Sequence, residues 1–200
     1  MAIISDGTTI ADAASFSVSL GNMVLLNTAT ASNSASLSFN STYITSTYPI
    51  YKFEFINIHP ATNSAYFQVN LSIDNGSNYN VEVTNTLFRA YHRENGDNPT
   101  LTYETGADQA QGTAFIRLDE NDGGNDNDHS ASGILKLYNP SSTTFIKHYV
   151  GRVQYSQKDD YSINTYTQGY FNTTSAINNI QFKMGSGEIQ GGTIQVFGVA

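Results

Sequence analysis

An acidic segment in the middle of the chain carries the residue types that could bind a metal ion. Residues 119–128 hold five of the 17 acidic residues, interspersed with Asn and Gly. Calcium takes several oxygen ligands from a flexible loop, and the candidate ligands are Asp122, Asp126 and Asp128. The segment departs from the EF-hand pattern, because Gly124 stands where an oxygen ligand is required and no Glu closes the loop. The alternative is a solvated hairpin loop of good turn formers.

Residues that catalyse other reactions occur without the spacing that such reactions need. Cysteine is absent, GxSxG does not occur, and the four histidines form no HxH or HExxH pair. Two carboxylates that are distant in sequence can still meet in a β-fold, so glycosidase chemistry stays open. The acids inside predicted strands are Glu54, Glu82 and Glu188. Each takes an outward position, which favours a chain that is not an enzyme and has no catalytic residues.

Tyrosines in the second half of the chain offer binding chemistry. They lie beside Asn, Gln and Ser, and a flat apolar ring with nearby hydrogen-bonding groups suits both sugars and protein interfaces. The candidate interface or glycan-binding residues are Tyr91, Tyr103, Tyr149, Tyr161, Tyr166 and Tyr170, with Tyr155 in the same population. The alternative is that these rings are half-buried in a sheet, with their hydroxyl groups at its rim.

The composition of the whole chain predicts an all-β protein. Asn, Ser and Thr contribute 63 of the 200 residues, while 13% of residues are charged and 12% are aromatic. Thr, Tyr, Phe, Val and Ile favour strands, whereas Asn, Gly and Ser favour turns. The net charge is −8 and the nine Lys and Arg residues are scattered singly, so nucleic acid is not expected as a partner. No apolar run reaches the ~18 residues of a membrane helix, so no membrane span is expected.

Runs of alternating residues punctuated by turn formers predict the strands. In residues 66–73 the apolar side chains share one face and the polar side chains share the other. Asn75–Gly76 then predicts a hairpin turn, with a return strand that begins at Tyr79. In residues 51–55 aromatic residues alternate with charged ones, which predicts a sheet with one solvent-facing side.

About ten such runs predict an all-β fold, a jelly-roll-like antiparallel β-sandwich. Residues 16–200 are expected to form this single domain, and residues 1–15 a short N-terminal arm. We expect the arm to cross to a neighbouring copy, where a strand added to a sheet edge would satisfy its backbone groups. The first residues lack the basic and apolar regions of a secretory signal, which predicts synthesis in a cytoplasm without export by that route.

Several stretches outside the acidic segment are distinctive. They are INIHPAT (56–62), FRAYH (88–92), DQAQGTA (108–114), YNPSSTT (138–144), GYFNTTSAIN (169–178), which runs on to Phe182, and GGTI (191–194). Together they resemble uncharacterised virion structural proteins of marine tailed phages, including those of cyanobacteria and pelagic bacteria. The resemblance covers most of the chain from about Met23 onward. It implies a virion context and transfers no active-site residues.

The resemblance implies a protein that is assembled in the host cytoplasm and located in the virion. We expect a non-enzymatic head decoration (cement) protein that binds the phage capsid shell and sister subunits, as a homo-oligomer for which a trimer is expected by analogy. One alternative is a tail-fibre or receptor-binding protein that recognises host cell-surface glycan, with calcium in the acidic segment. Another is a free lectin or a glycan-cleaving enzyme. No cofactor is expected apart from that calcium.

Overall fold

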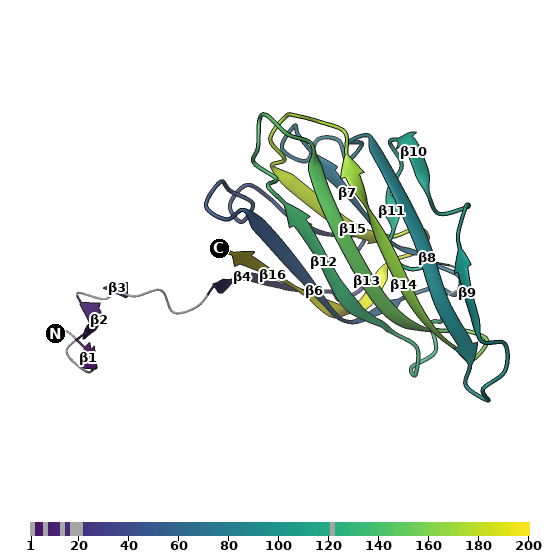
Figure 1. The fold of residues 1–200 in the computed structure, drawn as a ribbon. Coiled ribbons are helices and arrows are strands. Elements are labelled where there is room, and N and C mark those ends of the chain that lie inside the picture. Colours follow the sequence, from purple (N-terminus) through teal and green to yellow (C-terminus); the bar gives the residue numbers. More distant parts are fainter. Residues whose placement is uncertain (1–2, 6–7, 13–14, 17–21, 121–122) are drawn as a thin grey trace.

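The computed structural model describes residues 3–5, 8–12, 15–16, 22–120 and 123–200. From Met23 onward the chain forms two antiparallel sheets that pack face to face, and the described residues contain no helix (Figure 1). The predicted all-β antiparallel sandwich is therefore confirmed. Jelly-roll connectivity is consistent with this arrangement and stays a prediction. No helix that could cross a membrane occurs in the part of the chain that is described.

The larger sheet has nine strands. Its order is β10-β8-β14-β13-β12-β6-β16-β4, with β9 also paired to β8. β12, β13 and β14 are consecutive in the chain, whereas β6 and β16 bring distant segments together. The strands are β4 (Met23–Thr30), β6 (Ile50–Pro60), β8 (Val83–Arg93), β9 (Thr100–Tyr103), β10 (Gln109–Gly112), β12 (Ala131–Tyr138), β13 (Lys147–Gln157), β14 (Tyr161–Phe171) and β16 (Ile189–Val199).

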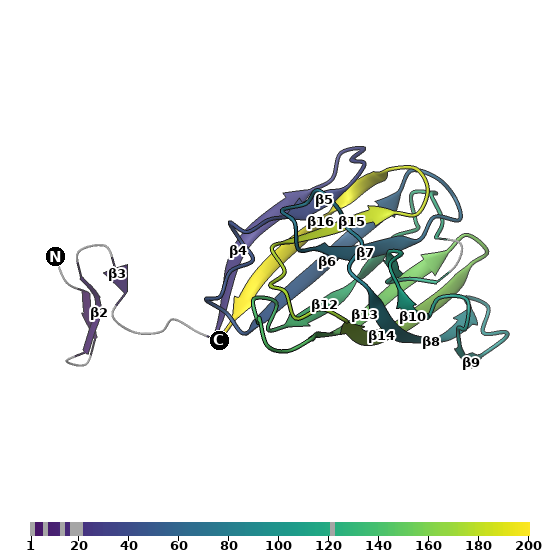
Figure 2. The ribbon, with the colours of Figure 1, turned by 90° about the horizontal axis from the view of Figure 1, so that it is seen from above.

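The smaller sheet covers one face of the larger one (Figure 2). It has four strands in the order β11-β7-β15-β5. Its strands are β5 (Leu37–Phe39), β7 (Phe67–Ser72), β11 (Ile116–Arg117) and β15 (Asn179–Met184). Because β5 follows β4 in sequence and both stand at the ends of their sheets, the two strands share one lateral side of the sandwich.

The hairpin predicted around Asn75–Gly76 is wrong in its pairing. The turn itself forms, because Asn75 and Gly76 have φ values of 61° and 85°. However, β7 pairs with β11 and β15, and the chain next enters the other sheet as β8. The carboxylate of Asp74 fixes this crossover, accepting hydrogen bonds from the Asn78 side chain and the Ser72 hydroxyl, both at 2.7 Å. These bonds, together with one from the Asn78 backbone, lower the pKa of Asp74 to about 2.

The polar face predicted for β7 also differs from the structure. Asn70 and Ser72 are fully buried, although they alternate with apolar residues as a solvent-facing row would. The Asn70 amide donates to the carbonyls of Thr113 and Ala114, both at 3.1 Å. The segment before β11 therefore covers this part of β7 and satisfies its buried amide. Residue alternation carries no information about such a covering segment.

Phenylalanines from both sheets form the centre of the core. Phe182 of β15 contacts the other four rings, with centroid distances of 5.3–6.2 Å. Lys52 and Glu54, the residues of β6 between its buried aromatic rings, point outward, as the alternation in residues 51–55 predicts. The five buried rings are Phe39, Phe53, Phe55, Phe67 and Phe182.

The N-terminal strands form a sheet of their own. β1 (Ile3–Ser5), β2 (Thr8–Asp12) and β3 (Ser15–Phe16) pair with one another in antiparallel order. The predicted arm, residues 1–15, falls in this segment, and the sandwich begins with β4. The boundary after residue 15 and the crossing of the arm to a neighbouring copy stay predictions.

Candidate functional site

The larger sheet turns one face to the core and the other to solvent. β13 shows the alternation most clearly, because Tyr149, Gly151, Val153 and Tyr155 are buried while the alternate residues, Val150, Arg152 and Gln154, are exposed. The outward side chains of β6, β8, β9, β12, β13 and β14 are neighbours by register. They form one surface, which we call the outer face. Cross-strand neighbours on such a face are its units of contact with a partner.

An aromatic and arginine row crosses the outer face. Phe88 of β8 stacks on Tyr166 of β14, with ring centroids 4.9 Å apart and planes 8° apart. The guanidinium of Arg152 on β13 lies 5.2 Å from the Tyr166 ring centroid, and its Nε donates to Asn164 at 3.2 Å. The register adds Tyr103 of β9 beside Phe88. Aromatic and arginine side chains dominate the affinity of many protein interfaces, so this row is a candidate binding site.

Exposed apolar side chains extend the row. Leu101, Tyr103 and Val150 are 73%, 48% and 47% exposed. Tyr170 packs edge-on against His148, with ring centroids 6.1 Å apart. The Tyr103 hydroxyl donates to Asp108 at 2.7 Å, and this bond raises the pKa of Tyr103. The outer face therefore offers apolar area that a partner could remove from water.

The outer face is positively charged, although the chain as a whole has a net charge of −8. In β6, β12, β13 and β14 its charged residues are Lys52, Lys136, Arg152 and Glu54, three cations and one acid, for a net charge of +2. Lys52 and Glu54 form an ion pair at 2.5 Å. A partner with an acidic surface would be complementary to this face.

A cleft lies on the core side of the same sheet, where β8, β13 and β14 end. It offers about 240 Å³ of space. The register of β14 and β8 pairs Tyr161 with Arg93 and Ile163 with Tyr91. The residues that line the cleft are Arg89, Tyr91, Arg93, Gln157, Asp159, Tyr161 and Ile163.

Two tyrosines, each beneath an arginine, form the walls of the cleft. Tyr91 and Tyr161 meet edge to face, with centroids 5.8 Å apart. Arg89 lies 4.8 Å from the Tyr91 centroid and Arg93 lies 4.9 Å from the Tyr161 centroid. Arg89 also donates to the Glu104 carboxylate at 2.6 Å. Burial lowers the pKa of Arg89, but this bond and the charge of Glu104 outweigh burial and raise it.

Gln157 gives the cleft an unused polar atom. Its side chain is buried, and its Oε1 has no hydrogen-bond partner among the described residues. The carboxylate of Asp159 and the guanidinium of Arg93 supply a further acceptor and further donors. Aromatic surface with several polar groups around it is an arrangement that suits a hydroxyl-rich ligand.

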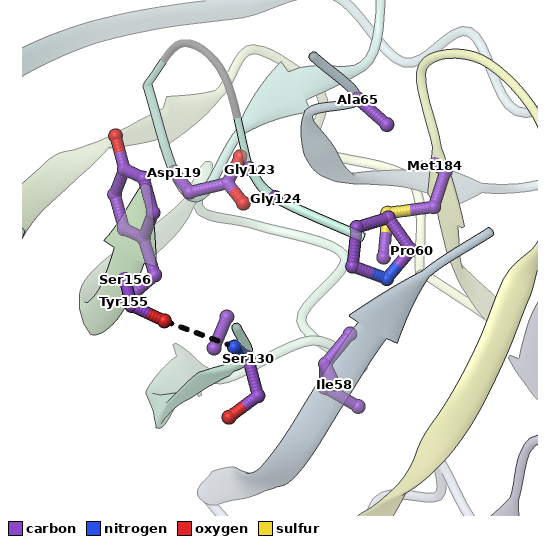
Figure 3. A pocket seen from close by; sticks show the side chains of 11 residues that line it. Ile58, Pro60, Ala65, Asp119, Gly123, Gly124, Ser130, Tyr155, Ser156 and Met184 are labelled. Carbon is purple, nitrogen blue, oxygen red and sulfur yellow. Dashed lines mark hydrogen bonds between the residues drawn. The ribbon is translucent and has the colours of Figure 1, made fainter. Parts of the chain in front are cut away.

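A buried acid lies deeper in the sandwich, next to β13 (Figure 3). The Asp119 side chain points into a small space opposite Pro60 and Met184. Burial raises the pKa of Asp119 to about 8, although its carboxylate accepts a hydrogen bond from the Phe67 amide at 2.7 Å. The space is about 10 Å³, room for at most one water molecule. Asp119 is therefore placed as a structural acid rather than as one that meets a substrate.

The predicted calcium ligands are only partly described. Asp122 lies outside the described residues. Asp128 has an 85% exposed side chain whose Oδ1 is 3.9 Å from the His129 Nε2. The Asp126 backbone carbonyl accepts a hydrogen bond from the His129 amide at 2.9 Å. Among the residues that the structure describes, no three His, Cys, Asp or Glu side chains are grouped as a metal site, and calcium binding stays a prediction.

The predicted tyrosines fall into different environments. Tyr91 and Tyr161 come together in the cleft, whereas Tyr103, Tyr166 and Tyr170 lie on the outer face.

The structure corrects the prediction that Tyr149 is an interface or glycan-binding residue. Tyr149 is 1% exposed and lies 3.2 Å from the Thr167 hydroxyl, and burial raises its pKa. Tyr155 is buried as well, with its hydroxyl donating to the Glu120 carbonyl. Both occupy inward positions of β13, and the sequence alone did not fix the parity of that strand.

The cleft arginines and the buried acid were missed by sequence reasoning. Arg89, Tyr91 and Arg93 alternate along one strand, so the pattern Arg-x-Tyr-x-Arg was a usable signal for one cationic, aromatic face. No sequence pattern indicated that Gln157 lines the cleft. Asp119 was grouped with the acidic segment, although it directly follows the apolar Leu118 that enters the core.

Comparison with known proteins does not assign the chain to a family. No family model matches the chain, and no curated protein matches it. A solved structure of unknown function from Bacteroides ovatus has 7% identity and a TM-score of 0.29, and the match covers 53% of this chain and 45% of that one. An aerolysin-like protein from Bombina maxima has 13% identity and a TM-score of 0.14, over 81% of this chain and 85% of that one. Likeness at this level carries no argument about function.

Proposed function

We propose that this chain is a non-enzymatic structural protein of a phage virion, a head decoration protein that binds the capsid shell through its outer face. The observation that carries the binding role is the exposed row of Phe88, Tyr166 and Arg152 on a sheet face. The phage context is supported by the sequence resemblance alone. Sister subunits would join it as a homo-oligomer, with a trimer expected by analogy.

The outer face has the physical properties that such docking needs. Its rings and the exposed Leu101 and Val150 would lose contact with water on a shell surface, at about 25 cal/mol per Å² of apolar area. Arg152 and Lys136 would set orientation and speed encounter with an acidic shell surface. A flat sheet can make these contacts without rearrangement, which lowers the cost of binding.

Labelled antibody on purified particles of the encoding phage tests the location, and we expect label on the head. Binding of added protein to shells that lack it tests the surface. Tyr166→Ser should weaken this binding, because it removes the centre of the row. Tyr161→Ser, which removes a tyrosine of the cleft, is the matched control and should bind like the unaltered chain. A chain that never accompanies the particles would overturn the proposal.

A second candidate function is recognition of host glycan by a tail or receptor-binding protein. The cleft favours it, because Tyr91 and Tyr161 meet there beside Arg93 and the unused amide oxygen of Gln157. Retention of specific sugars on a glycan array tests this candidate. A free lectin would bind the same sugars without accompanying a particle, so the antibody experiment separates the two.

A further inference from the structure

The sandwich has five edge strands, and four of them are short. β11 has two residues, β5 has three, and β9 and β10 have four each. β10 is also irregular, since its register with β8 shifts and Gln111 has a φ of 55°. Short or bulged edge strands are the usual protection against pairing with another chain. β4, with eight residues, is the longest edge strand, although a register shift at Leu26 interrupts its pairing with β16.

The β4 edge is long and apolar at its start. Met23, Val24 and Leu25 are 48%, 44% and 50% exposed. The strand contains neither Lys nor Pro, the two residues that commonly block an exposed edge. Its one pairing among the sandwich strands is with β16, so its other side presents backbone groups that an added chain could engage.

The sequence around β4 carries no charge. Residues 13–51 contain no Asp, Glu, Lys or Arg, in a chain of 26 charged residues. Within this stretch, β4, β5 and the segments beside them form one lateral side of the sandwich (Figure 2). We call residues 23–48 the uncharged flank. Charged residues border the flank: Glu188 precedes the Ser34–Ile189 bridge, and Lys52 and Glu54 lie across β16 from it.

We infer that the uncharged flank is the surface on which a second copy of this chain docks, flank to flank. Two copies with a net charge of −8 each repel one another wherever their acidic surfaces meet. The uncharged flank is the side on which they can approach without bringing like charges into contact. A partner of opposite charge would gain nothing from a surface without charge, so the flank suits self-association better than binding of a cationic protein.

The size and chemistry of the flank suit a specific contact. Of its 26 residues, Ala31, Phe39 and Ile44 are buried, which leaves 23 that reach the surface, and one side of a standard interface contains roughly 20–30. Met23, Val24 and Leu25 supply exposed apolar area, while the Asn, Ser and Thr residues supply hydrogen-bonding groups. The inference specifies the sister-subunit contact of the proposed function, and it applies to the free protein whether or not that protein joins a virion.

The test is the mass of the full chain in solution, measured by sedimentation over a range of concentrations. We expect multiples of 21.8 kDa. Val24→Lys should raise the dissociation constant by roughly tenfold or more, because each contact would bury a new pair of like charges. Val150→Lys makes the same substitution at an equally exposed valine of the outer face and should associate normally.

Three further observations make the outcome decisive. If circular dichroism shows that Val24→Lys is unfolded, Thr28→Lys takes its place. Thr28 is at an exposed and already polar position of β4. Added salt should strengthen association or leave it unchanged, because it screens repulsion between copies and breaks no ion pair. A monomer at every concentration would overturn the inference, as would equal loss in Val24→Lys and Val150→Lys. If Val150→Lys is the one variant that loses shell binding, the result supports shell binding through the outer face and is consistent with self-association through the uncharged flank.

Discussion

The two lateral sides of the sandwich share one core but differ in charge. The side formed by β4 and β5 is uncharged, whereas the side formed by β8, β9 and β11 carries the Arg89–Glu104 and Arg117–Glu120 ion pairs. Because both sides pack on the same core, core packing does not require them to differ in charge. The difference in charge separates a side suited to contact between identical copies from a side suited to polar ligands.

The edges repeat this contrast. The uncharged side ends in the eight-residue strand β4 and the three-residue strand β5, while the charged side ends in strands of two to four residues. On the charged side, the Gln157 amide oxygen in the cleft also has no hydrogen-bond partner among the described residues. Where a sandwich leaves an edge open, lack of charge is as informative as exposed apolar area about the partner expected there.

The largest expected effect comes from the core that joins the two sides. Phe182→Ala removes the ring that contacts four other phenylalanines and should cost about 3–5 kcal/mol of unfolding free energy. Urea denaturation measures it. Phe145→Ala, at a 67% exposed ring, is the control and should stay within about 0.5 kcal/mol of the unaltered chain. Separate unfolding of the two sides would show that they do not rest on one core.

Asp119 should make the charged side sensitive to pH. Its pKa is about 8 in the folded chain and ordinarily 3.8, so the folded state retains a proton that the unfolded state releases. The contribution of Asp119 to stability is therefore fully present below pH 4 and is lost as the pH rises toward 8. Asp119→Asn keeps an acceptor for the Phe67 amide and should remove this slope. Unfolding free energies of both chains at pH 5 and pH 8 measure the difference, and equal slopes would contradict the assignment.

The smallest expected effect concerns the cleft. Tyr161→Ala removes one wall and should weaken retention of a bound glycan several-fold, since one aromatic contact contributes about 0.5–1.5 kcal/mol. Tyr166→Ala, which removes an outer-face ring of the same type, should leave retention unchanged. Glycan-array binding of the three proteins measures this. No sugar retained by the unaltered chain would remove glycan recognition from the charged side.

Much of the fold follows from local pattern. The alternation in residues 51–55 placed aromatic rings inward and charges outward, and β6 has this arrangement. The pairing of β7 did not follow, because Asn75–Gly76 specifies a turn but not the sheet that the chain enters next. The inward position of Tyr149 did not follow either, since period-two alternation fixes relative parity and leaves open which parity faces the core.

The sequence by itself determined the strand content, the alternation within the strands and the long uncharged stretch of residues 13–51. These are local properties, set by side-chain shape and charge. Tertiary structure decided that β4 and β5 of this stretch stand at two sheet edges, that Arg93 and Tyr161 share a cleft, and that Asp119 is buried. Each of these depends on strands distant in sequence lying side by side, and long-range pairing is set by the packing of the whole core.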